Sequence, residues 1–208
     1  MSDHRLKSAP ETIKGASCDD SSGDGESFLL KRLLASRTLM LAGGVDTALS
    51  RRIANQLLLL EAENAEEPIT IIMNSPGGSV SDGFLIYDMI KFVTPRVRIL
   101  CSGLAASIAT IILMAPEKRD RLALPNTRFM IHQPLIPMSV YGPASDLEIT
   151  ANEILKTREK INRVLAEGTG QSVEKVSKDT QRDYWLDADE AKAYGLVDRV
   201  IASRGEID

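Results

Sequence analysis

Apolar residues in this chain fall into short runs that alternate with longer stretches of helical periodicity. Short apolar runs bounded by Gly, Pro or charge predict strands, and apolar residues at helical spacing predict helices. The predicted strands cover 38–42, 69–73, 97–101, 122–124, 128–131 and 196–201; the predicted helices cover 28–35, 46–62, 79–92, 105–114, 145–167 and 187–194. This alternation indicates βαβ units on a largely parallel sheet, and therefore an α/β fold.

The first 26 residues differ from the rest of the chain. They are rich in Ser, Asp, Gly and Lys and hold few large apolar side chains. Such a segment cannot bury enough apolar surface to offset the entropy lost on ordering. We therefore predict a flexible polar tail over 1–26, one folded domain over 27–203 and a short tail over 204–208. Ser27 is the expected N-cap of the first helix.

The segment 145–167 contains neither Gly nor Pro, and Leu147, Ile154 and Ile161 recur in it at seven-residue steps. As a helix it would be about 35 Å long at about 1.5 Å per residue. This exceeds the usual length of helices in globular domains. We expect part of the helix to project beyond the core and pack on another subunit. Gly168 and Gly170 should end the helix. The alternative is a helix inside the core.

Composition restricts the function classes. The chain has 208 residues and a net charge of −4, which does not favour nucleic acid as a partner. No apolar run reaches the length that spans a bilayer, and the N-terminus shows no hydrophobic core of a signal peptide. The two cysteines, Cys18 and Cys101, fit a reducing compartment better than a disulfide framework. We expect a cytoplasmic protein without membrane contact.

Ser107 is the candidate nucleophile, because it follows a predicted strand in a run of tiny residues that leaves room for a substrate backbone. A nucleophilic serine needs an imidazole base, and the base needs an acid to orient it. The chain has two histidines, and His4 lies in the polar tail, so His132 is the plausible base. Each residue also has a commoner interpretation. Ser107 could be a small residue that permits close helix packing, and His132 could be a core histidine. Ala105 and Ala109 occupy the glycine positions of the Gly-x-Ser-x-Gly elbow, so that motif is absent.

The segment 74–78 (NSPGG) has two interpretations. Proline followed by two glycines is typical of a tight turn. The functional interpretation is an oxyanion hole, since glycine lets a backbone N–H approach a reacting carbonyl without a side chain in the way.

Taken together, these segments resemble the proteolytic subunit of the Clp protease, the serine peptidase ring of ATP-dependent proteolysis. The resemblance covers about 29–201. It is carried by 60–64 (LEAEN), 74–78 (NSPGG), 87–88 (YD), 105–107 (AAS), 124–126 (LPN), 130–135 (MIHQPL), 179–183 (DTQRD) and 194–198 (YGLVD).

The resemblance implies a nucleophile at Ser107, a base at His132 and an orienting acid at Asp183. Two acids lie in the matching stretch, and the family's acid is the second one, directly after the arginine. The oxyanion donors would be the backbone N–H groups of Gly78 and Ile108.

The resemblance also implies a crotonase-like βα-spiral with a long handle helix, assembled into heptameric rings that stack as a tetradecamer. Such a barrel cleaves unfolded polypeptides delivered by an AAA+ unfoldase, and needs neither a cofactor nor a metal.

The chain departs from the family pattern in ways that resemble a divergent paralogue. Thr70 and Ile72 stand where aromatic residues commonly line the docking pocket for the ATPase, and Gln181 stands at a commonly acidic position. Leu104, Ile108 and Ala109 replace the usual Gln, Met and Gly, and the loop 136–142 is longer than usual. The alternative function is therefore a weakly active structural or regulatory ring that pairs with a second, more typical subunit.

Two further classes fit less well. Acyl-CoA enzymes of the crotonase fold use two backbone N–H groups but need no Ser107 and His132 pair. Membrane-bound peptidases of related fold use a Ser–Lys pair and a transmembrane anchor, and the sequence shows no such segment.

Overall fold

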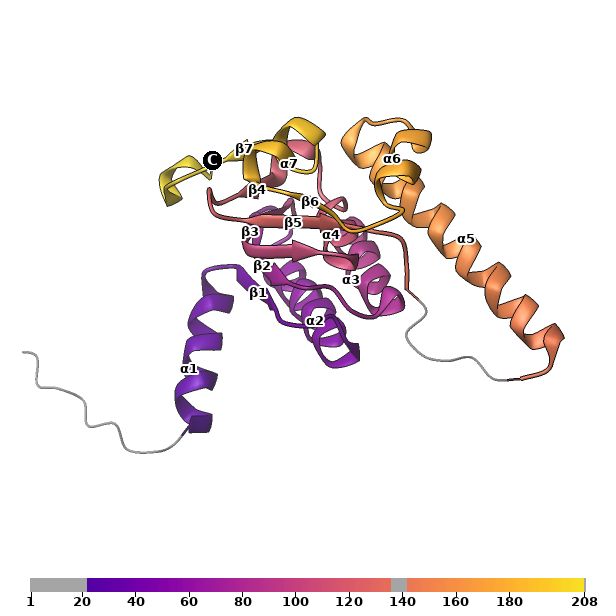
Figure 1. Cartoon of the computed structure of the whole chain (residues 1–208). Helices are drawn as coiled ribbons and strands as arrows, with labels where there is room; N and C mark the ends of the chain where they lie inside the picture. The colour runs from indigo at the N-terminus through magenta and orange to yellow at the C-terminus, as the bar shows by residue number, and fades with distance from the viewer. Residues whose placement is uncertain (1–21, 136–141, 208) are drawn as a thin grey trace, which may run out of the picture.

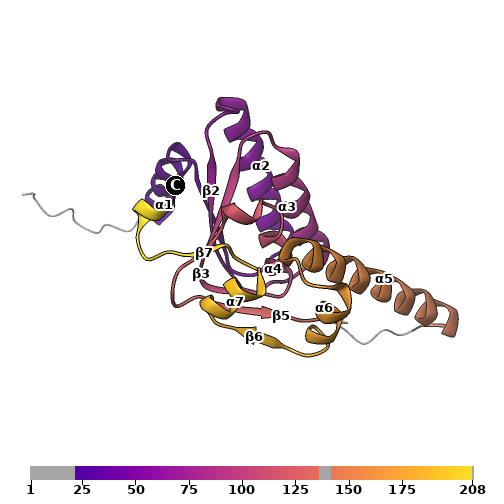
Figure 2. The same cartoon turned by 90° about the horizontal axis from the view of Figure 1, so that it is seen from above.

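The computed structural model describes residues 22–135 and 142–207. The α-helices are α1 (Ser22–Ala35), α2 (Thr47–Glu63), α3 (Val80–Phe92), α4 (Ile108–Leu113), α5 (Ala144–Thr169), α6 (Val173–Asp179) and α7 (Ala188–Tyr194); the strands are β1 (Thr38–Ala42), β2 (Ile69–Ser75), β3 (Val97–Ala106), β4 (Arg121–Ala123), β5 (Arg128–Ile131), β6 (Tyr184–Leu186) and β7 (Arg199–Val200). Short 3₁₀ helices, η1 (Lys118–Asp120) and η2 (Arg204–Glu206), complete these elements. Figures 1 and 2 show α1 and α5 at opposite ends of the molecule, with the sheet between them.

The sheet is parallel except at one edge, as the alternation of strands and helices predicts. Strands β1, β2, β3, β4 and β7 pair in parallel in that order. The long strand β3 pairs with β4 through 99–101 and with β5 through 104–106, so it joins two parts of the sheet. Strand β6, which the pattern did not predict, pairs with β5 in the antiparallel sense.

One predicted boundary in β3 is wrong. The pattern predicted that the strand ends at Cys101 and that a helix begins at Ala105, whereas β3 continues to Ala106 and α4 begins at Ile108. The reason is pairing on both sides, because Ala105 lies opposite Ser75 of β2 and Phe129 of β5. Because of this extension, the last residue of β3, Ala106, lies opposite Met130, near the end of β5.

Helices α2 and α3 begin where the sequence predicts. The Asp46 carboxylate accepts a hydrogen bond from the Leu49 N–H, and the Ser79 hydroxyl accepts one from the Asp82 N–H. The buried face of α2 repeats at helical spacing and comprises Leu49, Ser50, Ile53, Ala54, Leu57 and Leu60. The leucine and isoleucine side chains of this face belong to the main hydrophobic core, together with buried residues of β1 and β2.

The ends of the chain are more structured than expected. Helix α1 begins at Ser22, so the predicted tail and the predicted cap at Ser27 do not match the structure, while residues 1–21 lie outside the described residues. At the other end, Glu206 caps η2 together with Ser203, and Arg199 donates a hydrogen bond to the Glu206 carbonyl. The expected tail over 204–208 is therefore folded onto the body through residue 207.

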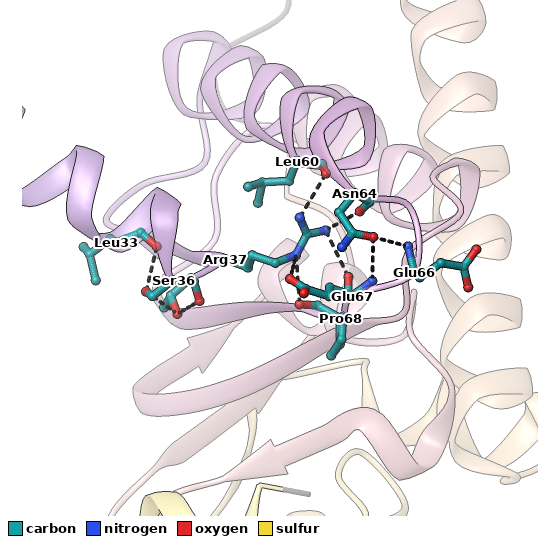
Figure 3. Close-up of polar contacts among 9 residues, drawn as sticks. Leu33, Ser36, Arg37, Leu60, Asn64, Glu66, Glu67 and Pro68 are labelled. Carbon is teal, nitrogen blue, oxygen red and sulfur yellow. Dashed lines mark hydrogen bonds and ion pairs between the residues drawn. The ribbon is translucent and has the colours of Figure 1, made fainter.

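Arg37 ties the start of β1 to the end of α2 (Figure 3). Its backbone has a φ of 52°, which turns the chain sharply out of α1. Its guanidinium donates to the carbonyls of Leu60, Asn64 and Glu67 at 3.0, 2.8 and 2.9 Å. These carbonyls lie at and just beyond the C-terminal end of α2, where a cation complements the helix dipole.

Helix α5 projects from the body, as predicted (Figures 1 and 2). Its 26 residues span about 39 Å at about 1.5 Å per residue. Residues of its second half, including Ile161 and Leu165, are buried, whereas Leu147, Ile149 and Leu155 are exposed. The core-helix alternative is thus wrong for the first half. The helix also passes through Gly168 and ends at Gly170, which is left-handed.

The expected longer loop over 136–142 lies outside the described residues up to Tyr141. Within the ranges that the structure describes, no helix combines the length and apolar character needed to cross a membrane.

Candidate active site

Ser107 occupies a sharp turn between β3 and α4. Its φ is 57° and its ψ −128°, so a non-glycine residue is held in a backbone conformation that costs about 1–3 kcal/mol. The turn is held on both sides: the Ser107 N–H donates to the Met130 carbonyl at 2.8 Å, and the Thr110 hydroxyl donates to the Ser107 carbonyl at 2.6 Å. The arrangement is the strand–turn–helix geometry of a nucleophile elbow, built without the glycines of its motif.

His132 follows β5 directly and contacts two of the predicted residues. Its Nε2 lies 2.8 Å from Ser107 Oγ, and its Nδ1 lies 3.1 Å from Asp183 Oδ1. The register of β5 and β6 brings about the second contact, because Ile131 pairs with Tyr184 and the residues next to this pair are His132 and Asp183. His132 therefore links a hydroxyl to a carboxylate and is no ordinary core histidine.

The two candidate acids have different surroundings. The Asp179 carboxylate, at the end of α6, accepts from Lys175 Nζ at 2.6 Å and from the Tyr194 hydroxyl at 2.9 Å. Burial and this carboxylate raise the pKa of Tyr194, which keeps the phenol protonated as a donor. Asp183 instead contacts His132 and has a side chain that is 62% exposed. The structure brings Asp183, and not Asp179, against the imidazole.

Gly77 brings backbone close to Ser107, whereas Gly78 lies against Val45. Gly77 has a φ of 92°, and a Cβ on it would lie 2.6 Å from the Ser107 Cβ. Gly78 has a φ of 152°, and a Cβ on it would collide with the Val45 backbone. Side chains at these positions would therefore clash, and the positive φ values fit the tight-turn interpretation. The oxyanion-hole interpretation stays a prediction.

The N–H groups of Gly78 and Ile108 donate to no group within the part of the chain that the structure describes. Ile108 is the first residue of α4, where an N–H has no intrahelical acceptor. The resemblance implies these two N–H groups as oxyanion donors, and that role stays a prediction. They are the kind of backbone groups that can bind a negatively charged oxygen next to a nucleophile.

Cys101 is not a second nucleophile. It lies on β3 and is fully buried. Burial raises the pKa of its thiol, so the reactive thiolate does not form at neutral pH.

A separate cavity of about 410 Å³ lies against one face of the sheet, where it is lined by alternate residues of β2 and β3. Its lining includes Thr70 and Ile72, the positions at which aromatic residues were expected from the resemblance. The other lining residues are Ser36, Thr38, Arg98, Leu100, Leu124, Ile201, Ala202, Ser203, Arg204 and Ile207. The cavity is therefore lined by aliphatic and polar groups and by two arginines, without aromatic rings.

Comparison with known proteins identifies a family and related solved structures. A family model described as Clp protease matches residues 22–204. A solved structure of a ClpP1 mutant from Listeria monocytogenes is 46% identical in sequence, with a TM-score of 0.79. That match covers 86% of this chain and 99% of the other. Sequence and fold therefore agree over nearly all the described residues.

Proposed function

Because the chain belongs to the Clp protease family and has its fold, we propose that it is the serine endopeptidase subunit of a cytoplasmic, ATP-dependent proteolytic barrel. Its substrates are unfolded polypeptides delivered by an AAA+ unfoldase. The observation that carries this proposal is the unbroken line of contacts from Ser107 through His132 to Asp183, at 2.8 and 3.1 Å.

The geometry supports an acyl-enzyme mechanism. Ser107 Oγ attacks the scissile carbonyl while His132 Nε2 takes its proton, and the imidazolium then protonates the leaving amine. A water molecule next attacks the acyl carbonyl, with His132 again as the base, and Ser107 is released. Asp183 accepts the Nδ1–H, which keeps the ring in the required tautomer and stabilises its charged form.

The mechanism develops a second charge besides that of the imidazolium, on the oxygen of the tetrahedral intermediate. In the proposal, the N–H groups of Gly78 and Ile108 donate to it. Each such donor is worth about 10²–10³ in turnover in enzymes of this kind. Because both donors belong to the backbone, they are in place before the substrate binds.

The direct test is hydrolysis of an unstructured polypeptide by the purified protein, with intact mass spectrometry to detect an acyl adduct on Ser107. Addition of an AAA+ unfoldase and ATP should extend cleavage to folded substrates. Absence of both adduct and hydrolysis, in the homomeric protein and in mixtures with a second Clp peptidase subunit, would contradict the proposal.

The outer half of α5 is the proposed contact between two rings. Ile154 lies in its apolar stripe, and Ile154→Glu should convert a double ring into single rings or smaller species. A carboxylate placed in an apolar contact costs several kcal/mol, and the contact repeats around the ring. Light scattering gives the mass. The control is Asn152→Glu, which adds the same charge to an exposed position off the stripe. A double ring that survives Ile154→Glu would refute the contact.

The alternative, a ring that works best beside a more typical subunit, is supported by specific positions. The cavity at Thr70 and Ile72 lacks the aromatic surface that anchors a partner's loop most strongly. Gln181 is exposed and carries no charge to pair with an arginine of a facing ring. In the mixed barrel, Ser107 supplies cleavage and the second ring recruits the unfoldase.

We expect this protein with an unfoldase alone to degrade a folded substrate slowly, and a mixture with a second subunit to degrade it fast. Gel-based degradation with ATP measures both rates. A mixture that contains the Ser107→Ala form of this chain is the control, because it keeps the assembly but removes this subunit's cleavage. Fast, ATP-dependent degradation without a second subunit would exclude the mixed-barrel requirement.

A further inference from the structure

A buried hydroxyl interrupts the apolar face of α2. Ser50 is fully buried there among leucine, isoleucine and alanine side chains. A buried polar group needs a hydrogen-bond partner, and the Ser50 hydroxyl donates to the Asp82 carboxylate of α3 at 2.8 Å. The hydroxyl of Thr47, the first residue of α2, donates to the other carboxylate oxygen at 3.3 Å. Asp82 thus ties the first turns of two helices that lie side by side (Figure 2).

The tie between the helices is a charged one. Hydrogen bonds from the hydroxyls of Ser79, Ser50 and Thr47 hold the pKa of Asp82 below the ordinary value of an aspartate. Hydrogen bonds to an ionised acceptor are roughly twice as strong as those between neutral groups. The dipole of α3 also favours a negative charge in its first turn. The carboxylate is therefore a stronger link than a neutral side chain would be.

The two tied helices follow the loops of the proposed site. The loop before α2 contains Val45, and the loop before α3 contains Gly77 and Gly78. The Val45 N–H donates to the Gly77 carbonyl, and the Ser79 N–H donates to the Val45 carbonyl, both at 2.8 Å. These two bonds hold the backbone on both sides of Gly78, whose own N–H is one of the two proposed oxyanion donors.

The first turn of α3 also contacts the residue that carries the second proposed donor. Gly83, the residue after Asp82, packs on Ile108 of α4, because a Cβ on Gly83 would collide with the Ile108 Cγ1. Both proposed donors therefore depend on where α3 begins. Gly78 is linked to α3 through the chain, and Ile108 is linked to it through packing.

We propose that Asp82 is a positioning residue for the proposed peptidase reaction. By fixing the start of α3 on α2, it sets where the N–H groups of Gly78 and Ile108 lie relative to the oxygen that both would bind. Asp82 acts through the backbone and not on the substrate. The inference rests on the proposed function. Its effect can be large, because a displacement of about 1 Å at a catalytic group can cost about 10²-fold in rate.

The test compares turnover of a fluorogenic peptide with affinity for a peptide aldehyde, whose adduct with Ser107 resembles the tetrahedral intermediate. Asp82→Ala should lower kcat by about 10-fold, less than the about 10²–10³ of a donor that is lost altogether. Affinity for the aldehyde should fall by a similar factor, because the same donors bind its oxygen. KM should change little, since the bound substrate does not yet use these donors.

Three further variants sharpen the test. Ser50→Ala should also lower kcat, and the double variant Ser50→Ala/Asp82→Ala should be no worse than Asp82→Ala, because both changes break one tie. Asp82→Asn keeps an acceptor oxygen and should retain most of the turnover. The matched control is Asp88→Ala, which removes an exposed carboxylate from the same helix and should behave as the wild type.

An Asp82→Ala protein that keeps its kcat and its aldehyde affinity would overturn the inference, and so would a loss confined to KM or to thermal stability. Additive losses in the double variant would overturn the route through Ser50. If Asp82→Ala does not fold, the same measurements on Ser50→Ala decide the question.

Labelling of wild-type Ser107 with a fluorophosphonate separates this inference from the proposed function. A wild type that labels and cleaves, beside an unaffected Asp82→Ala protein, would overturn the role of Asp82 and leave the peptidase standing. A wild type that neither labels nor cleaves the peptide would overturn the peptidase, and this inference with it.

Discussion

Replacement of Ser107 by alanine is expected to abolish peptide hydrolysis and acyl-enzyme formation while the fold and the assembly persist. The change removes a single oxygen that contacts His132. Alanine keeps the Cβ, so the strain of the positive φ at this position remains the same. Any residual rate of hydrolysis would come from the backbone donors and from substrate binding alone. In such enzymes this residual rate is a small fraction of the full rate.

Labelling with a fluorophosphonate, followed by mass spectrometry, measures the loss of the reactive serine. Light scattering verifies the assembly, and thermal unfolding verifies the fold. Ser102→Ala, on the same strand, is the control and should label as the wild type does. Labelling that persists in the Ser107→Ala protein would exclude Ser107 as the nucleophile.

Asp183→Asn should lower the turnover of peptide hydrolysis by about 10⁴, because an amide in place of the carboxylate favours the wrong imidazole tautomer. The contact between Asp183 Oδ1 and His132 Nδ1 is the reason why we expect this acid to be the orienting group. Substrate binding should change little, so the effect should be in kcat rather than in KM.

Asp179→Asn is the matched control for this prediction. Its carboxylate contacts Lys175 and Tyr194, so its replacement should act mainly on stability. Steady-state kinetics on both variants makes the comparison. A large loss of kcat in Asp179→Asn with a small one in Asp183→Asn would identify the first acid as the orienting group.

The approach of Ser107 to His132 could be predicted because so few residues in the chain can do this chemistry. The contact between His132 and Asp183 could not be derived from the pattern. It depends on β6, a strand of three residues that is too short to show alternation. Two of those residues are exposed aromatics, Tyr184 and Trp185, so no buried face marks the strand either. The resemblance to a family supplied this acid, where periodicity did not.

Two boundary errors have one physical cause. Ala105 and Ala106 are good helix formers, yet they extend β3, because Ala105 pairs with both β2 and β5 and Ala106 pairs with β5. A glycine such as Gly168 is typical of a helix end, yet α5 continues through it. The absence of a side chain on Gly168 leaves the space that Met114 occupies. In each case a tertiary contact overrides a local preference.

One helix reaches from the proposed ring contact to the active site. The outer half of α5 stands clear of the body, while Ile161 and Leu165 of its inner half form a wall beside Ser107. A continuous helix moves as a rod over this length, so a neighbour that displaces the outer half also shifts the wall. Binding at the wall and association at the tip are then thermodynamically linked, and such linkage is reciprocal. We therefore expect the shape of the site to differ between a subunit held in an assembly and one free in solution.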